Sequence, residues 1–119
     1  LAEYNGRKQA EQTTDMIGRI RNYVSEFLNE ELSLTKLSEL VHLSPPYLSR
    51  MYKQTTGQGL LEYVTEVRMN RSKQLLRTTE YKIQDIAGLV GLDSAAYFTR
   101  LFKKETGVTP LEYRESVAK

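Results

Sequence analysis

The chain has 119 residues and no cysteine, so it holds one domain or two very small ones and cannot form disulfides or use thiolate chemistry. No apolar run approaches the ~20 residues of a membrane-spanning helix, and the polar start lacks the apolar core of a signal peptide, so we expect a cytoplasmic protein. The formal net charge is only +2, but residues 1–43 carry 5 basic and 7 acidic groups whereas residues 44–119 carry 12 and 8.

Apolar side chains recur every three or four residues along most of the chain, a spacing that predicts amphipathic helices. Residues 1–15 lack this period and are expected to form a linker or a frayed tail. Helices are predicted over residues 16–29, 34–41, 45–57, 60–77, 83–90 and 94–107, and a last helix opens at Thr109. Since no alternating β-type pattern occurs, the predicted fold class is all-α with seven helices.

Hydroxyl residues stand where the predicted helices should begin. A serine or threonine at this place accepts a hydrogen bond from a first-turn amide that otherwise lacks a partner. The predicted N-caps are Ser33, Ser44, Ser94 and Thr109, and Glu112 completes a capping box with Thr109.

The strongest feature is an internal repeat, because YLSRMYKQTTG at 47–57 returns as YFTRLFKKETG at 97–107. A helical solenoid usually needs three or more repeats to bury a continuous core, so two copies favour a pair of helix-turn-helix units. We predict a homeodomain-like arrangement of two such subdomains joined by a long central linker helix. The predicted segments are a tail at 1–15, a first subdomain at 16–58, the linker helix at 59–78 and a second subdomain at 79–119.

Each predicted turn needs a residue that accepts a positive φ, because the two helices otherwise cannot meet at a steep angle. Gly91 stands there in the second copy and His42, less comfortably, in the first. His42 is the only histidine and has no second ligand type beside it, so we interpret it as a turn residue rather than a catalytic or metal-binding one. No cofactor, metal site or catalytic residue is predicted.

The repeated helices are expected to bury one apolar stripe each, made by Tyr47, Leu48, Met51 and Tyr52 and by Tyr97, Phe98, Leu101 and Phe102. The opposite sides carry Pro46, Ser49, Arg50 and Lys53, matched by Ala96, Thr99, Arg100 and Lys103. Small residues let a helix enter the major groove, where an arginine can read a guanine edge and a lysine can meet phosphate. A single exposed arginine or lysine is most simply a solvated charge. The recurrence of both an arginine and a lysine at equivalent places in the two copies favours contact with DNA.

The run DIAGLVGLDSAAYFTRLFKKETGVTPLEYR resembles the AraC/XylS family of bacterial transcription regulators, and the resemblance covers about residues 17–118. It implies recognition helices at about 45–57 and 94–107 that enter successive major-groove segments of double-stranded promoter DNA. Members of the family often carry larger polar or aromatic residues where this chain has Pro46, Ala95 and Ala96. Fewer hydrogen bonds to bases are therefore expected from this chain. The implied base-reading residues are Pro46, Ser49, Arg50, Ala95, Ala96, Thr99 and Arg100, and the expected phosphate-binding residues are Ser33, Ser44, Lys53, Ser94 and Lys103.

The resemblance also implies partners beyond DNA. It implies a nucleoid-associated activator that also contacts RNA polymerase. The sequence of residues 17–57 is most similar to members fused to the receiver domain of a two-component system. We expect the isolated domain to be monomeric, whereas a dimer of the full-length protein is left open. Four basic residues of the linker helix are interpreted as solvated rather than phosphate-binding: Arg68, Arg71, Lys73 and Arg77.

Two other functions stay open at this point. A helical protein-interaction module could contact RNA polymerase or another regulator through the same faces, and salt-dependent binding to a duplex would separate it from a DNA reader. An enzyme is disfavoured, because carboxylates such as Glu62, Asp85 and Glu112 are predicted at caps or helix surfaces without a paired partner or a nucleophile.

Overall fold

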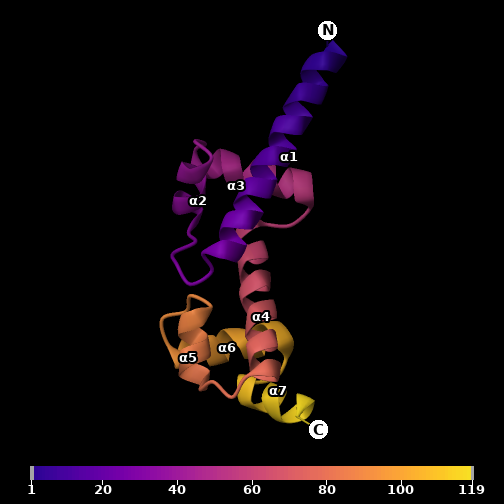
Figure 1. Ribbon diagram of the computed structural model, residues 1–119. Helices are drawn as coiled ribbons and strands as arrows, with labels where there is room; N and C mark the ends of the chain where they lie inside the picture. The colour runs from indigo at the N-terminus through magenta and orange to yellow at the C-terminus, as the bar shows by residue number, and fades with distance from the viewer. Residues whose placement is uncertain (1, 119) are drawn as a thin grey trace. The chain divides into compact units, whose positions relative to one another are not determined.

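The computed structural model describes the backbone of residues 2–118 and the side chains of residues 9–118. Within that range the secondary structure is seven α-helices and no strand, which confirms the predicted class (Figure 1). Among the helices described, none combines the length and the apolar character needed to cross a membrane. The helices are α1 (Ala2–Glu26), α2 (Leu34–Leu40), α3 (Pro45–Thr56), α4 (Leu60–Thr78), α5 (Ile83–Leu89), α6 (Ala95–Thr106) and α7 (Pro110–Val117).

These helices divide into two compact units. The first unit is Leu1–Phe27 with Leu32–Tyr63, so it holds α1, α2, α3 and the first turn of α4. The second unit is Leu28–Glu31 with Val64–Lys119, so the short segment after α1 belongs to the second unit. The rest of α4 also belongs to the second unit and is part of its core.

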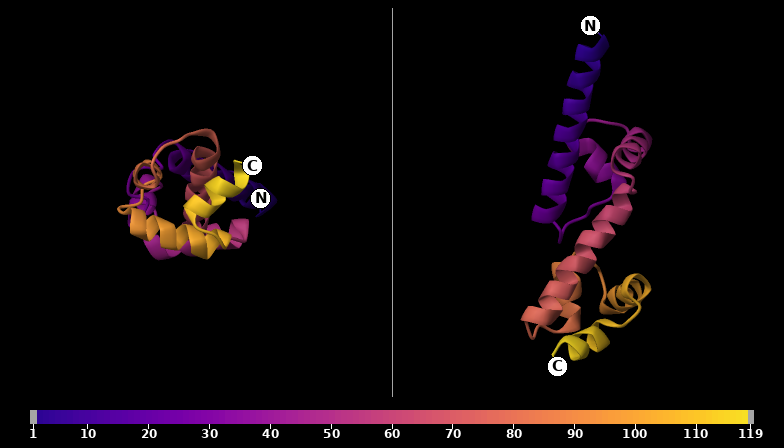
Figure 2. Two further views of the ribbon diagram at one scale, coloured as in Figure 1. Left: turned by 90° about the horizontal axis from the view of Figure 1, so that it is seen from below. Right: turned by 90° about the vertical axis from the view of Figure 1, so that its right-hand side faces the viewer.

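In the first unit, α1, α2 and α3 lie against one another (Figure 2). Ile20, Val24, Leu37 and Leu48 are fully buried between them, and the first two lie one turn apart on the same face of α1. Tyr52 is buried as well, and its hydroxyl accepts a hydrogen bond of 3.2 Å from Arg21 Nε on α1. This bond satisfies the polar end of a ring that the core otherwise encloses.

Helix α1 differs from the prediction at both of its ends. It runs from Ala2 to Glu26, whereas the apolar spacing predicted a helix over 16–29 and a linker or frayed tail before it. The period marks only the part of a helix that packs, and it begins at Met16. The preceding residues are mostly Glu, Gln, Arg, Lys and Ala, which favour helix without packing, so the helix continues through them.

In the second unit, the aromatic residues of the repeat form the core. Phe98 and Phe102 are fully buried, with ring centroids 5.8 Å apart, and Phe102 packs edge-on against Tyr113 at 5.7 Å. The Tyr113 hydroxyl accepts a hydrogen bond of 3.0 Å from Arg77 Nη1 on α4. Arg77, expected to be solvated, therefore helps to join α4 to α7.

The four predicted N-caps are confirmed. The hydroxyls of Ser33, Ser44 and Ser94 accept bonds of 3.1, 3.3 and 3.0 Å from amides three residues later. Thr109 and Glu112 form the predicted capping box, because each side chain accepts a bond from the other residue's amide, at 3.1 and 2.9 Å. The bond from the Thr109 amide is also the main reason that the pKa of Glu112 is lowered.

The predicted turn residues have the predicted backbone conformation. His42 has a φ of 58° and is the only non-glycine residue with a positive φ in the part of the chain described, while Gly91 has a φ of 84°. Gly91 also meets the segment before α2, since an added Cβ would overlap the Leu28 carbonyl oxygen and lie 2.9 Å from Arg68 Nη2. Glycine is therefore required there for its conformation and for space.

Arg68 is not the solvated residue that we predicted. Its side chain is half-buried between α4 and the Leu28–Glu31 segment, and Nη2 donates a 3.2 Å hydrogen bond to the Glu30 carbonyl oxygen. Burial lowers its pKa, which Tyr97 and Asp93 partly offset. Arg68 therefore fastens the Leu28–Glu31 segment to α4, a role that depends on contacts between residues far apart in the chain.

Candidate nucleic-acid interface

Helix α3 exposes the predicted cationic face. Its buried residues, Leu48 and Tyr52, are one turn apart and turn the opposite side of the helix outward. The αL conformation of Gly57, with a φ of 80°, ends the helix directly after Thr56. All four predicted residues of this face are exposed: Pro46, Ser49, Arg50 and Lys53.

Helix α6 repeats this arrangement with smaller side chains near its start. Phe98 and Phe102 occupy the places of Leu48 and Tyr52, and Gly107 ends the helix as Gly57 ends α3. Among the predicted residues, Ala96, Arg100 and Lys103 are exposed, whereas Ala95 and Thr99 are half-buried. The half-buried pair lies at the edge of the face, where its atoms are only partly accessible to a ligand.

Two residues placed in the apolar stripes are in fact outward. Tyr47 and Tyr97 were expected to face the core, yet each is 45% exposed. They lie at the flank of the stripe, one position before the fully buried Leu48 and Phe98, so each tyrosine is partly covered and partly accessible. A repeating spacing identifies the centre of a stripe but not how far the neighbouring elements cover its flank.

The four cations of these faces are available to a partner. Within the described part of the chain, the side chains of Arg50 and Arg100 form no ion pair or hydrogen bond, and the same holds for the side chains of Lys53 and Lys103. Arg50 stacks over the Tyr47 ring, with its guanidinium carbon 5.9 Å from the ring centroid. Lys103 lies close enough to Glu112 to contribute to the low pKa of that carboxyl.

The helix starts differ in what they offer to an anion. In α6 the first two residues, Ala95 and Ala96, have amides without an intrahelical acceptor, and only the third amide is bound to Ser94. In α3 the first two residues are Pro45 and Pro46, which have no amide hydrogen. The start of α3 therefore offers no free first-turn amide to an anion, although the Ser44 hydroxyl there is exposed.

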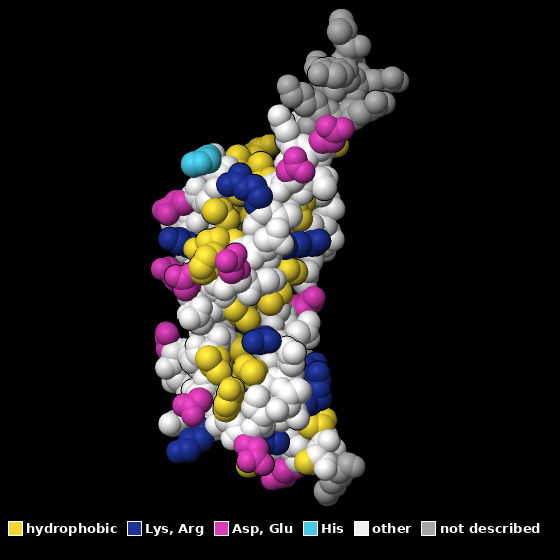
Figure 3. All heavy atoms as spheres, viewed as in Figure 1, with side chains coloured by type: hydrophobic (Ala, Val, Ile, Leu, Met, Phe, Trp, Pro, Cys, Tyr) yellow, Lys and Arg dark blue, Asp and Glu magenta, His cyan; other side chains and the backbone are white. Residues whose placement is uncertain are grey.

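The remaining predicted positions are less prominent. Ser33 caps α2, which has only seven residues, and is half-buried. His42, shown in cyan in Figure 3, is exposed at the turn that follows α2. No group of three or more His, Cys, Asp or Glu side chains among the described residues is arranged to hold a metal ion.

Comparison with known proteins identifies the repeated unit. A family model described as a helix-turn-helix domain matches residues 37–116. The bifunctional transcriptional activator/DNA repair enzyme AdaA of Bacillus subtilis is 37% identical over 102 residues, which are 86% of this chain and 48% of that protein. The chain spans about half or less of the length of the curated relatives that it matches.

Two solved structures share the fold. The C-terminal domain of the two-component response regulator yesN of Fusobacterium nucleatum is 38% identical with a TM-score of 0.81, covering 84% of this chain and 98% of that one. A transcriptional regulator from Chromobacterium violaceum, described as having an AraC-type DNA-binding domain, is 26% identical with a TM-score of 0.75, covering 95% and 97%. The two repeated units and these matches show that the chain belongs to the AraC-type family of helix-turn-helix proteins.

Proposed function

We propose that this chain is the sequence-specific, double-stranded DNA-binding part of a longer bacterial transcription regulator. The observation that carries the proposal is the pair of matched faces on α3 and α6, each with an exposed arginine and lysine whose side chains form no ion pair or hydrogen bond with a described residue. Core packing explains why Leu48 and Phe98 recur after a duplication. It gives no reason for Arg50 and Arg100 to recur at an exposed place.

In the proposed complex, α6 enters the major groove with its small residues nearest the base edges. Ala95, Ala96 and Thr99 leave room for close approach and for contact with thymine methyl groups. Arg100, one turn after Ala96, donates two parallel hydrogen bonds to a guanine. Lys103 and the first-turn amides, with Ser94 beside them, meet phosphates.

Helix α3 reads a second groove segment of the same duplex, so one chain recognises an asymmetric site of two blocks. Arg50 has the role of Arg100, and Ser49 and Pro46 make the closest approach to the bases. Since the start of α3 has no first-turn amide to offer, its phosphate contacts depend on Lys53 and the Ser44 hydroxyl, with Ser33 as a minor contributor. Few of these side chains discriminate between bases by hydrogen bonding, so part of the specificity comes from DNA shape.

The relatives suggest the setting of this domain. AdaA is longer than the chain and the yesN match is one domain of a response regulator, so we propose that a sensing module, such as a receiver domain, lies in the same protein. RNA polymerase is the proposed further partner. The nucleoid in the cytoplasm is the proposed place of action. We propose no catalytic activity for this segment, because the matched faces of α3 and α6 do not form a reaction site.

The salt dependence of binding tests the proposal. With a fluorescent 30-base-pair duplex of random sequence, we expect binding that weakens linearly in a plot of log affinity against log salt. Lys53→Ala and Lys103→Ala should each lower the slope by about one, because each removes one phosphate contact. Arg71→Ala is the matched control, since Arg71 is an exposed cation of α4 outside both faces, and its slope should be that of the wild type.

A different result would favour the alternative function. Ordinary non-specific binding to a duplex is detectable at ~100 μM protein in low salt. If the chain bound no duplex under these conditions, the DNA proposal would be wrong. Equal slopes for all three variants and the wild type would show that the two faces do not meet phosphates. A module that binds RNA polymerase or another regulator would then be the better account.

A further inference from the structure

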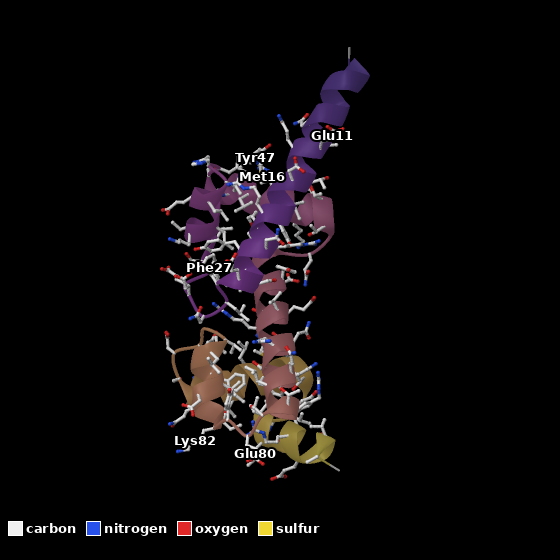
Figure 4. All side chains as sticks on the ribbon, viewed as in Figure 1. Glu11, Met16, Phe27, Tyr47, Glu80 and Lys82 are labelled. Carbon is white, nitrogen blue, oxygen red and sulfur yellow. The ribbon has the colours of Figure 1, made fainter. Side chains whose placement is uncertain are left out.

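Two matched tyrosines stand beside the proposed base-reading arginines. Tyr47 and Tyr97 are the third residues of α3 and α6, three positions before Arg50 and Arg100. Each is 45% exposed, and the side chain of Tyr47 on α3 is labelled in Figure 4. The same half-exposed aromatic residue thus occurs twice, at equivalent places on the two faces.

Packing accounts for only part of these side chains. The core tyrosines have their hydroxyls bound, since Tyr52 accepts a bond from Arg21 and Tyr113 accepts one from Arg77. The hydroxyls of Tyr47 and Tyr97, in contrast, have no hydrogen-bond partner among the described residues. A leucine or phenylalanine would cover the core equally well at either place, so packing does not explain the two hydroxyls.

The two rings have different cationic neighbours. Tyr47 lies under Arg50, with 5.9 Å between the guanidinium carbon and the ring centroid. This stacking limits the conformations of an otherwise unbound arginine and so lowers the entropy cost of fixing it on a base. Tyr97 instead lies near Arg68 of α4, which belongs to the same unit.

We infer that both tyrosines belong to the DNA interface, an inference that rests on the proposed function. Each hydroxyl donates a hydrogen bond to a backbone phosphate next to the base that the neighbouring arginine reads. Tyr47 also acts as a positioning residue for Arg50, whereas Tyr97 has no such effect on Arg100. Similar helices therefore read the two halves of the DNA site, but only the arginine of α3 is positioned by a tyrosine.

Tyr47→Phe and Tyr97→Phe test the hydroxyls. The probes are the duplex that the wild type selects from a random library and a duplex of scrambled sequence. We expect each variant to bind both probes about three- to tenfold more weakly, as for the loss of one hydrogen bond, and to keep the salt slope because no charge is removed. Tyr23→Phe, on a half-buried tyrosine of α1 that packs on Phe27, is the matched control and should bind like the wild type.

Tyr47→Leu and Tyr97→Leu test the positioning role. Loss of the Tyr47 ring should also reduce the preference for the selected duplex over one in which the guanine read by Arg50 is replaced. Loss of the Tyr97 ring should leave the corresponding preference of Arg100 unchanged. Thermal unfolding of each variant, expected to match the wild type within a few degrees, checks that the comparison concerns folded protein.

Replacing single phosphates of the selected duplex by uncharged methylphosphonate gives an independent readout. At the phosphate that Tyr97 contacts, the penalty of Tyr97→Phe should disappear, and the same should hold for Tyr47 at a different phosphate. Wild-type affinity for both phenylalanine variants, while Arg50→Ala and Arg100→Ala bind weakly, would overturn this inference and leave the proposed function standing. Failure of the wild type to bind any duplex would overturn both.

Discussion

A double variant, Arg50→Ala with Arg100→Ala, is expected to lose almost all preference for the duplex that the wild type selects. Each bidentate arginine–guanine contact is worth about 1–3 kcal/mol against the wrong base. The two residues lie in different units and share no partner, so their effects should add to about 2–6 kcal/mol. This corresponds to a loss of roughly 30-fold to more than 10,000-fold in affinity for the selected duplex.

The fold should be unaffected by this double change. Both side chains are exposed and neither forms a hydrogen bond with a described residue, so unfolding midpoints should stay close to those of the wild type. Affinity for a scrambled duplex should fall much less, because it depends on phosphate contacts. Equal affinities of the double variant and the wild type for the selected duplex would refute the proposed reading of bases.

The largest effect on stability is expected for Gly91→Ala. An alanine at a φ of 84° has the left-handed strain of about 1–2 kcal/mol. Its Cβ would also overlap the Leu28 carbonyl oxygen and crowd Arg68, and such overpacking costs about 1–3 kcal/mol more. We therefore expect a loss of about 2–5 kcal/mol, measured by urea unfolding, with faster amide exchange across α5 and α6.

Gly107→Ala is the matched control for this experiment. Gly107 has nearly the same φ, 88°, but no atom lies within 4 Å of an added Cβ. Only the left-handed strain applies there, so the loss should be about 1–2 kcal/mol. Similar losses in the two variants would show that Gly91 is needed for its conformation alone, and that the close approach of Leu28 to the turn is not part of the folded state.

Features that depend on local chemistry were predicted well from the sequence. The N-caps Ser33, Ser44 and Ser94 and the capping box at Thr109 follow from a hydroxyl group and amides within one turn. The turn at Gly91 follows from the backbone freedom of a single residue. The outward faces of α3 and α6 follow from the spacing of their buried residues and from the repeat, which supplies two independent copies of the pattern.

Features that depend on distant segments were predicted poorly. Arg68 was taken as solvated because nothing near it in the sequence shows that Leu28–Glu31 packs against α4. Tyr47 and Tyr97 were assigned to the core because a spacing of three and four residues does not show where coverage by other elements stops. Helix α1 extends beyond the apolar pattern because the sequence before Met16 is rich in residue types with high helix propensity.

One difference between α3 and α6 was present in the sequence. Pro45 and Pro46 follow the Ser44 cap, and a first turn tolerates them because its amides have no intrahelical partner. The lack of an amide hydrogen on proline also removes the groups through which a helix start binds phosphate. The two recognition helices therefore differ chemically at their starts, although their later turns are closely matched.

The central claim is that one chain reads two blocks of DNA with α3 and α6. Selection of bound duplexes from a random library, repeated with Arg50→Ala and with Arg100→Ala, tests it most directly. We predict an asymmetric motif of two blocks about one helical turn apart, in which each variant loses the base preference of one block and keeps the other. A motif that contains a single block, or one that both variants alter at the same position, would contradict the account.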